Sequence, residues 1–361
     1  MWRKLLLRFL VLWWSRLTKT NIRIQNTDKD EKNNMNLLEE YGRPYKEYKG
    51  TGKLHDSVGA DFPVNFTCIQ LNDSSIYIYA THSSTYPLPS QPPEDEFLTS
   101  LSGHLDDGRS FETLGNMSLI QSSHSSEGSQ AQLNYVFNVD SFEIKNVTSL
   151  ISQKPQYLRF ALTNFKFYGT SLSKKPGSGG QFRSLNLTIG GHNIIILQES
   201  DYDESVRLLS KTKTCRVSSY LYIEYNGNSF SALESIINDL CILLSFANGT
   251  IICSLNYEEL DGSGKVLKTH HRYMSTSIYG DLGFIAYNDP TLLKNFIETI
   301  YPTYANINPI YRLDQIIDTV VIAKLNKDFA ELEGLKVSSI VDVLSKRWKQ
   351  IQKKNLALKQ A

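Results

Sequence analysis

Apolar and polar residues alternate along much of the chain from Tyr48 to Glu224, which is the two-residue period of half-buried β-strands. Short turns rich in Asn, Asp and Gly separate many of these runs, so neighbouring runs are expected to pair as hairpins. The hairpins predicted here are 65–71 with 75–80, 98–105 with 110–114, and 185–189 with 193–199. Further strands are expected at 51–54, 116–121, 133–139, 157–168 and 216–224. About ten strands with short turns indicate a β-sandwich or a barrel-like body.

Polar segments without alternation interrupt this pattern and are predicted to be loops. Residues 83–95 contain four prolines, residues 122–131 are rich in Ser, and residues 171–180 combine Ser, Lys and Gly. The glycines at 177–180 are not followed by the Gly-Lys-Ser/Thr of a phosphate-binding loop, so a linker is the preferred interpretation.

The period changes to three and four residues at 231–246, where Leu and Ile recur at the spacing of one helix face. Ser231 and Glu234 have the spacing of a capping box at its start, and Asn248-Gly249 is a typical helix end. A hairpin of 250–258 with 265–273 is expected next. Other helices are predicted at 201–211 and 290–300, and one or two long amphipathic helices are predicted over 313–328 and 329–352.

These patterns predict an α+β protein with three parts. An N-terminal extension, 1–34, is followed by a β-rich sandwich- or barrel-like module at 45–285, which includes one helix and a hairpin, and by a helical tail at 286–361. The extension begins with a basic, apolar segment. Its apolar run, 5–14, contains Arg8 and is too short to span a membrane, which needs about 20 residues. It offers no small-residue cleavage site of a signal peptide. Three interpretations stay open: a helix on a membrane surface, packing on the protein, or an upstream extension of a gene that starts at Met35.

Composition and charge exclude few classes of function. The 38 basic and 37 acidic residues give a net charge of +1, so no overall field favours nucleic acid or a membrane. The four cysteines lack CxxC spacing and lie in apolar or strand-like runs, which predicts buried free thiols and a reducing, cytoplasmic compartment. No metal site and no cofactor are predicted.

No complete catalytic motif is visible, so no catalytic residue is predicted and the chain is expected to lack enzyme activity. His270 and Arg272 lie two residues apart on an expected strand, on one face, where together they are candidates for contact with an anion or ligand. The alternative is a structural strand with its histidine hydrogen-bonded to the backbone. Lys346, Arg347 and Lys349 in the tail are candidates for nucleic-acid contact, although a solvated helix face explains them equally well.

Several blocks together resemble a bacterial family, namely LSGHLDDGR at 101–109, RFALTNF at 159–165, DLCILLSFANGT at 239–250, His270 with Arg272, and 296–304. They resemble proteins related to the ApeA-type N-terminal domain, in which a β-rich module precedes a helical HEPN domain. The resemblance implies a HEPN-like tail and a link to antiviral defence. The catalytic signature of HEPN ribonucleases is an Arg followed four to six residues later by His, and this sequence has no His after His271.

Two functional hypotheses follow. The first is a non-catalytic sensor or scaffold that binds a partner protein or ligand through the β-rich module. The second is an RNA-binding or degenerate RNase subunit that uses the tail with His270 and Arg272. Association of the chain with itself through the tail, and contact of residues 1–20 with a membrane, stay open as further interactions. The expected location is the cytoplasm, with membrane association as the alternative.

Overall fold

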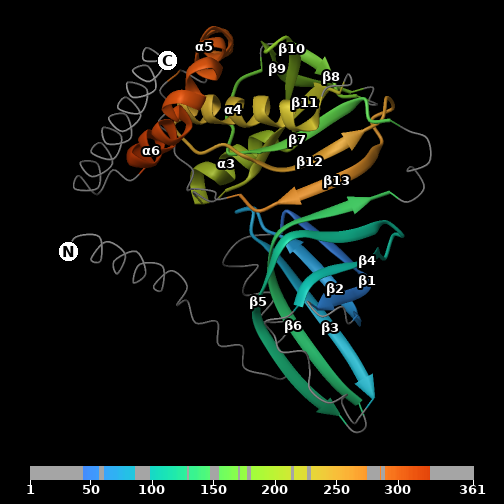
Figure 1. Cartoon of the computed structure of the whole chain (residues 1–361). Coiled ribbons are helices and arrows are strands. Elements are labelled where there is room, and N and C mark those ends of the chain that lie inside the picture. The colour runs from blue at the N-terminus through green and yellow to red at the C-terminus, as the bar shows by residue number, and fades with distance from the viewer. Residues whose placement is uncertain are drawn as a thin grey trace, which may run out of the picture. The chain divides into compact units, whose positions relative to one another are not determined.

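The computed structural model describes residues 44–56, 61–85, 98–127, 130–146, 154–169, 171–176, 180–212, 215–225, 229–274, 285 and 289–325. All of them belong to one compact unit, Pro44–Ala361. The predicted extension, the helix expected at 329–352 and the candidate residues Lys346, Arg347 and Lys349 lie outside the described residues. The overall α+β class and the barrel-like module are confirmed, and the HEPN-like character of the tail stays a prediction (Figure 1).

Six antiparallel strands form a closed barrel. Their order is β3-β2-β1-β4-β5-β6, and pairing of β3 with β6 closes the ring. The strands are β1 (Lys46–Asp56), β2 (Asp61–Gln70), β3 (Ile76–Thr85), β4 (Leu98–Leu105), β5 (Ser110–Glu127) and β6 (Gln130–Lys145). Every second residue faces the interior, where large side chains such as Phe66, Phe111, Phe137 and Phe142 are almost completely buried.

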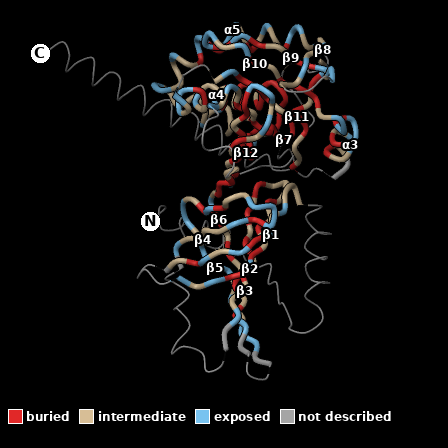
Figure 2. Tube along the Cα trace, turned by 90° about the vertical axis from the view of Figure 1, so that its right-hand side faces the viewer, coloured by how far each residue is buried: buried red, intermediate tan, exposed pale blue. Residues whose placement is uncertain are grey.

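Seven more strands extend this sheet from β6, in the order β13-β12-β7-β11-β10-β9-β8. They are β7 (Tyr157–Thr163), β8 (Ser171–Lys174), β9 (Gln181–Ile189), β10 (His192–Gln198), β11 (Val217–Glu224), β12 (Ser254–Leu260) and β13 (Val266–Arg272). The helices are α3 (Tyr202–Thr212), α4 (Phe230–Asn248), α5 (Pro290–Tyr311) and α6 (Leu313–Leu325). A second core lies between this sheet and the helices, and it takes residues from β7, β9, β10, β11, α4 and α5 (Figure 2).

Helix α4 follows the apolar periodicity seen in the sequence. Among the described residues it is the one helix that is long and apolar enough to cross a membrane, and one of its faces is buried in the second core. Its start corrects the predicted capping box: Ser229, not Ser231, caps the helix and accepts a hydrogen bond from the Ala232 N–H at 3.2 Å. Its end is confirmed, because Gly249 adopts the left-handed conformation with φ 65°.

Three predicted segments differ from the structure. Most of the expected loop 122–131 is strand, because β5 and β6 continue as a long ribbon in which Ser122 pairs with Tyr135. Part of the expected loop 171–180 is the short edge strand β8. The strand expected at 157–168 ends at Thr163, because Asn164 is left-handed and its side chain bonds to Arg216 N–H and Ile251 O.

The predicted hairpins are confirmed as β2–β3, β4–β5, β9–β10 and β12–β13. The helix expected at 290–300 is confirmed and is longer than predicted, since it continues through Pro302 and Pro309. All four cysteines are buried and free, as predicted. The domain boundary at 285–286 stays a prediction, although α5 and the sheet share one hydrophobic cluster.

Candidate functional site

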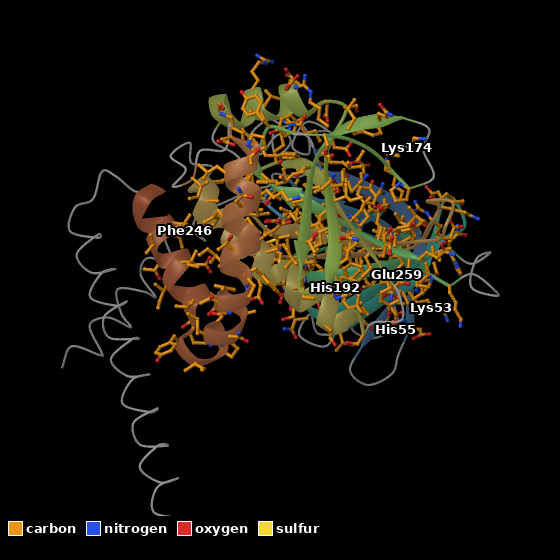
Figure 3. The ribbon with its side chains drawn as sticks, turned by 90° about the horizontal axis from the view of Figure 1, so that it is seen from above. Lys53, His55, Lys174, His192, Phe246 and Glu259 are labelled. Carbon is orange, nitrogen blue, oxygen red and sulfur yellow. The ribbon has the colours of Figure 1, made fainter. Side chains whose placement is uncertain are left out.

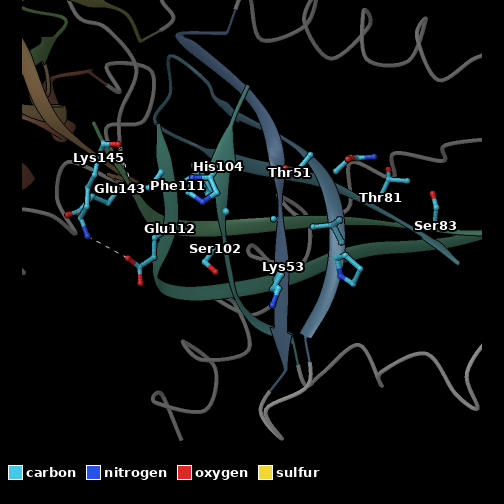
Figure 4. Close-up of a pocket in the computed structure, with 16 residues that line it drawn as sticks. Thr51, Lys53, Thr81, Ser83, Ser102, His104, Phe111, Glu112, Glu143 and Lys145 are labelled. Atoms are coloured by element: carbon cyan, nitrogen blue, oxygen red, sulfur yellow. Dashed lines mark hydrogen bonds and ion pairs between the residues drawn. The ribbon is translucent and has the colours of Figure 1, made fainter. Parts of the chain in front are cut away.

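A groove of about 850 Å³ crosses the outer face of the barrel (Figure 4). It runs over six strands, and most of its lining residues alternate with buried core residues, so their side chains face away from the barrel interior. The lining consists of Thr51, Gly52, Lys53, Pro63, Val64, Asn65, Thr81, Ser83, Ser102, Gly103, His104, Ser110, Phe111, Glu112, Glu143 and Lys145.

Glycines shape the groove where β1 meets β4. Gly52 pairs with Gly103 across the two strands. A Cβ atom on Gly52 would collide with the main chain at Ser102, and one on Gly103 would collide with the main chain at Thr51. Only glycine permits this close approach of two backbones, so the groove has main-chain atoms in its lining between the polar side chains on either side.

Ion pairs largely compensate the charges of the groove. Lys145 contacts Glu143 at 2.7 Å and Glu112 at 3.7 Å, and Lys268 on β13 contacts Glu143 at 2.5 Å. Burial by itself would raise the pKa of Glu143, but the two ammonium groups hydrogen-bonded to it hold that pKa below its ordinary value. Because opposite charges meet inside the groove, it presents mainly hydroxyl and amide groups to a ligand.

A chain of hydrogen bonds joins three strands at one end of the groove. His55 on β1 contacts Asp61 on β2 through Nδ1 at 2.8 Å, and Ser102 Oγ on β4 through Nε2 at 2.7 Å. The Lys53 ammonium donates to the second Asp61 oxygen at 3.0 Å (Figure 3 labels Lys53 and His55). The hydrogen bonds from Lys53 and His55 lower the pKa of Asp61, so this carboxylate is ionised at neutral pH.

Sequence reasoning found none of these groove residues. His55, Asp61 and Ser102 are separated by up to 47 positions and match no short motif. His55 faces Asp61 because the register of β1 and β2 places them opposite each other, and that register depends on tertiary structure. The alternation around each residue shows that it faces outward, but not which outward residues meet.

His270 and Arg272 lie on one face of β13, as predicted, and Arg272 is directed toward α4. The His270 ring stacks on Tyr257 with 4.9 Å between centroids, and burial lowers the pKa of His270 to about 4. Arg272 contacts Glu234 of α4 at 2.6 Å and donates to Ser254 O at 3.1 Å. Their surroundings are thus those of a packed structural strand, and contact with a ligand stays a prediction.

The neighbouring His271 connects the extended sheet to the barrel. It is completely buried, with Nδ1 2.6 Å from Gln70 Oε1 and Nε2 3.0 Å from the Tyr48 hydroxyl. Burial lowers the pKa of His271 well below its ordinary value, so the ring is neutral. Lys346, Arg347 and Lys349 lie outside the described residues, and their proposed contact with nucleic acid stays a prediction. Within the described ranges, no three His, Cys, Asp or Glu side chains are arranged to hold a metal ion.

Comparison with known proteins adds no assignment: no family model, no curated protein and no solved structure matches this chain.

Proposed function

We propose that this chain is a sensor or scaffold module that binds a small polar ligand in the groove of its β-barrel. The observation that carries the proposal is the groove itself. Its volume of about 850 Å³ lies within the range of about 300–1,000 Å³ that is usual for small-molecule sites. It is also built on strands, which hold side chains more rigidly than loops do.

The lining favours an uncharged ligand that carries hydroxyl or amide groups. Six lining side chains are hydroxyls or amides: Thr51, Asn65, Thr81, Ser83, Ser102 and Ser110. The carboxylates of the groove are already paired with Lys145 and Lys268. Phe111 is the one aromatic hydrocarbon ring in the lining, and it is buried in the barrel core. Single-stranded nucleic acid requires a positive groove with exposed aromatic rings, so this lining supports a small neutral ligand instead.

A path of contacts leads from the groove to the helices, which supports a sensor. Glu143 in the groove pairs across strands with His270, and the same β13 strand carries Arg272. Arg272 is bound to Glu234 on α4. A ligand that moves Glu143 would therefore act on the strand that holds α4.

The remaining parts of the functional hypothesis rest on sequence alone. The link to HEPN-associated defence, the cytoplasmic location and the oligomerisation through the tail stay predictions. The RNA-binding alternative also stays a prediction, and the three partners of Arg272, namely Glu234, Asn238 and Ser254 O, favour the ligand-binding hypothesis over it. Binding of RNA that weakens steeply with salt would restore that alternative.

The test uses the full chain with a panel of neutral disaccharides and blocked tripeptides. Asn65→Arg places a long cation in the groove, while Thr67→Arg, at the next outward position of β2, is the matched control outside it. We expect at least one compound to raise the melting temperature of the parent and of Thr67→Arg, but not of Asn65→Arg. No shift with any compound, or an equal shift in Asn65→Arg, would contradict the proposal.

A further inference from the structure

Ser102, His55 and Asp61 form a continuous hydrogen-bonded relay beside the proposed ligand groove, and Ser102 lines that groove. The side chains of His55 and Asp61 are 31% and 42% exposed, so the relay is open to solvent on one side. A chain of hydroxyl, imidazole and carboxylate in this order is the arrangement that activates a serine for nucleophilic attack.

The direction of each hydrogen bond follows from the ionised state of Asp61. A carboxylate only accepts hydrogen bonds, so the Nδ1 of His55 must carry the proton that lies between them. Whenever the imidazole is neutral, the other nitrogen is an acceptor, and Ser102 Oγ then donates its proton to Nε2. Nε2 is therefore placed to take the proton from the serine hydroxyl.

Strand pairing holds the three residues in place. His55 and Asp61 are direct cross-strand partners on β1 and β2. The pairing of β1 with β4 shifts at His55 and Asp56, and such bulges change the direction of side chains. Lys53, the direct partner of Ser102 on β1, holds the other Asp61 oxygen. The pairing of β1 with β2 and β4 thus positions the three side chains, in addition to the weak attraction between exposed groups.

We infer that Ser102 is a reactive serine that accepts an acyl group from a polar ester bound in the groove. The inference rests on the groove being the ligand site proposed above. Ser102 Oγ attacks the ester carbonyl carbon while its proton moves to His55 Nε2. The bond to the alcohol then breaks, and His55 returns the proton to the departing alkoxide, which leaves an acyl group on Ser102. Water repeats the sequence, releasing a carboxylic acid and the free serine.

In this scheme His55 is the general base, and Asp61 is a positioning residue that acts through His55. The main chain around Ser102 is engaged on both sides, because β4 pairs with β1 and with β5. Free N–H groups for an oxyanion are therefore not offered by this part of β4, and a single lost donor slows such reactions by about 10²–10³-fold. We accordingly expect reaction with activated esters and slow turnover.

The test is labelling by a fluorophosphonate probe, read by mass spectrometry of the intact chain and its peptides. Attack by Ser102 forms an O–P bond and expels fluoride, and the serine proton passes to His55. We expect one adduct, on Ser102, and labelling slower by about 10²-fold or more in His55→Gln. Asp61→Asn should also slow labelling, and Asp61→Glu should restore part of it. Ser118→Ala is the matched control, since Ser118 is an exposed serine of β5 outside the groove.

The outcomes separate the two proposals. Absence of an adduct, adducts spread over several serines, or a rate unchanged in both His55→Gln and Asp61→Asn would overturn the reactive serine. Melting temperatures of the variants, measured in parallel, show whether a slower rate reflects unfolding, and rescue by Asp61→Glu separates positioning from stability. If the sugar and peptide panel binds but Ser102 is not labelled, the groove is a binding site only. If Ser102 is labelled and no panel member binds, the proposed ligand class fails while the reactive serine stands.

Discussion

Replacing His270 by phenylalanine should make the free energy of unfolding less sensitive to acid. The His270 ring is stacked on Tyr257, with 15° between the ring planes, and phenylalanine can keep that stacking without a titratable group. The pKa of His270 is lowered from 6.5 to about 4, chiefly by burial; Glu143 on β6 acts to raise this pKa, while Arg272 and Lys268 act to lower it. Neutral His270 therefore persists in the folded protein at pH values where the unfolded chain is protonated.

The sign and size follow from proton uptake. Below about pH 6.5, His270 is protonated in the unfolded state but not in the folded state, so acid favours unfolding. The effect ends near pH 4, where His270 is also protonated in the folded state. The shift from 6.5 to about 4 spans about 2.5 pH units, which at about 1.4 kcal/mol per unit gives a total of roughly 3–4 kcal/mol. Buried His271 adds a similar effect to both proteins and cancels in their difference.

The assay is urea unfolding followed by far-UV circular dichroism between about pH 7.5 and pH 5. The free energy of unfolding of the parent, relative to His270→Phe, should stay constant near neutral pH and fall by about 1.4 kcal/mol per unit below pH 6.5. His124→Phe, at an exposed position of β5, is the control for loss of a histidine as such. A difference that stays flat down to pH 5 would refute the reasoning, because His270 would then take up its proton equally in both states.

Three other predictions address the helix end, the extension and the tail. Gly249→Val should destabilise the fold by about 1–2 kcal/mol or more, because a β-branched residue strongly disfavours the φ of 65° found at this position. Gly249→Asn should destabilise it less, since Asn tolerates the left-handed conformation better. Equal denaturant midpoints for the parent and Gly249→Val would contradict this prediction. Deletion of residues 1–34 should leave the melting temperature unchanged, because the polar residues 25–36 separate the basic, apolar segment from the first strand; a drop of several degrees would count against it. The purified chain should not cleave a mixed RNA pool, because no His follows His271 and Arg272 is bound to Glu234. Cleavage by the parent that is abolished in His270→Ala would instead show that the chain is a ribonuclease.

Local sequence determined the elements whose stability depends on near neighbours. The α4 helix could be predicted because one apolar face repeats at helical spacing and Gly249 supplies a left-handed end. The hairpins β2–β3 and β9–β10 could be predicted because short polar turns separate alternating runs. The capping residue was misplaced by two positions, since Ser229 and Ser231 are chemically equivalent candidates and only the helix geometry distinguishes them.

The tertiary structure decided the features that join distant segments. Residues 121–125 in the Ser-rich end of β5 include no buried side chain, so they give no periodic signal, and their strand conformation comes from pairing with β6. Closure of the barrel through β3 and β6 joins segments more than 40 positions apart, for example Thr85 with Gln130. The relay of His55, Asp61 and Ser102 arises in the same way. Alternation shows that each of these side chains faces outward, but a shift of one residue in either strand register would separate them, and that register is fixed by the closed barrel.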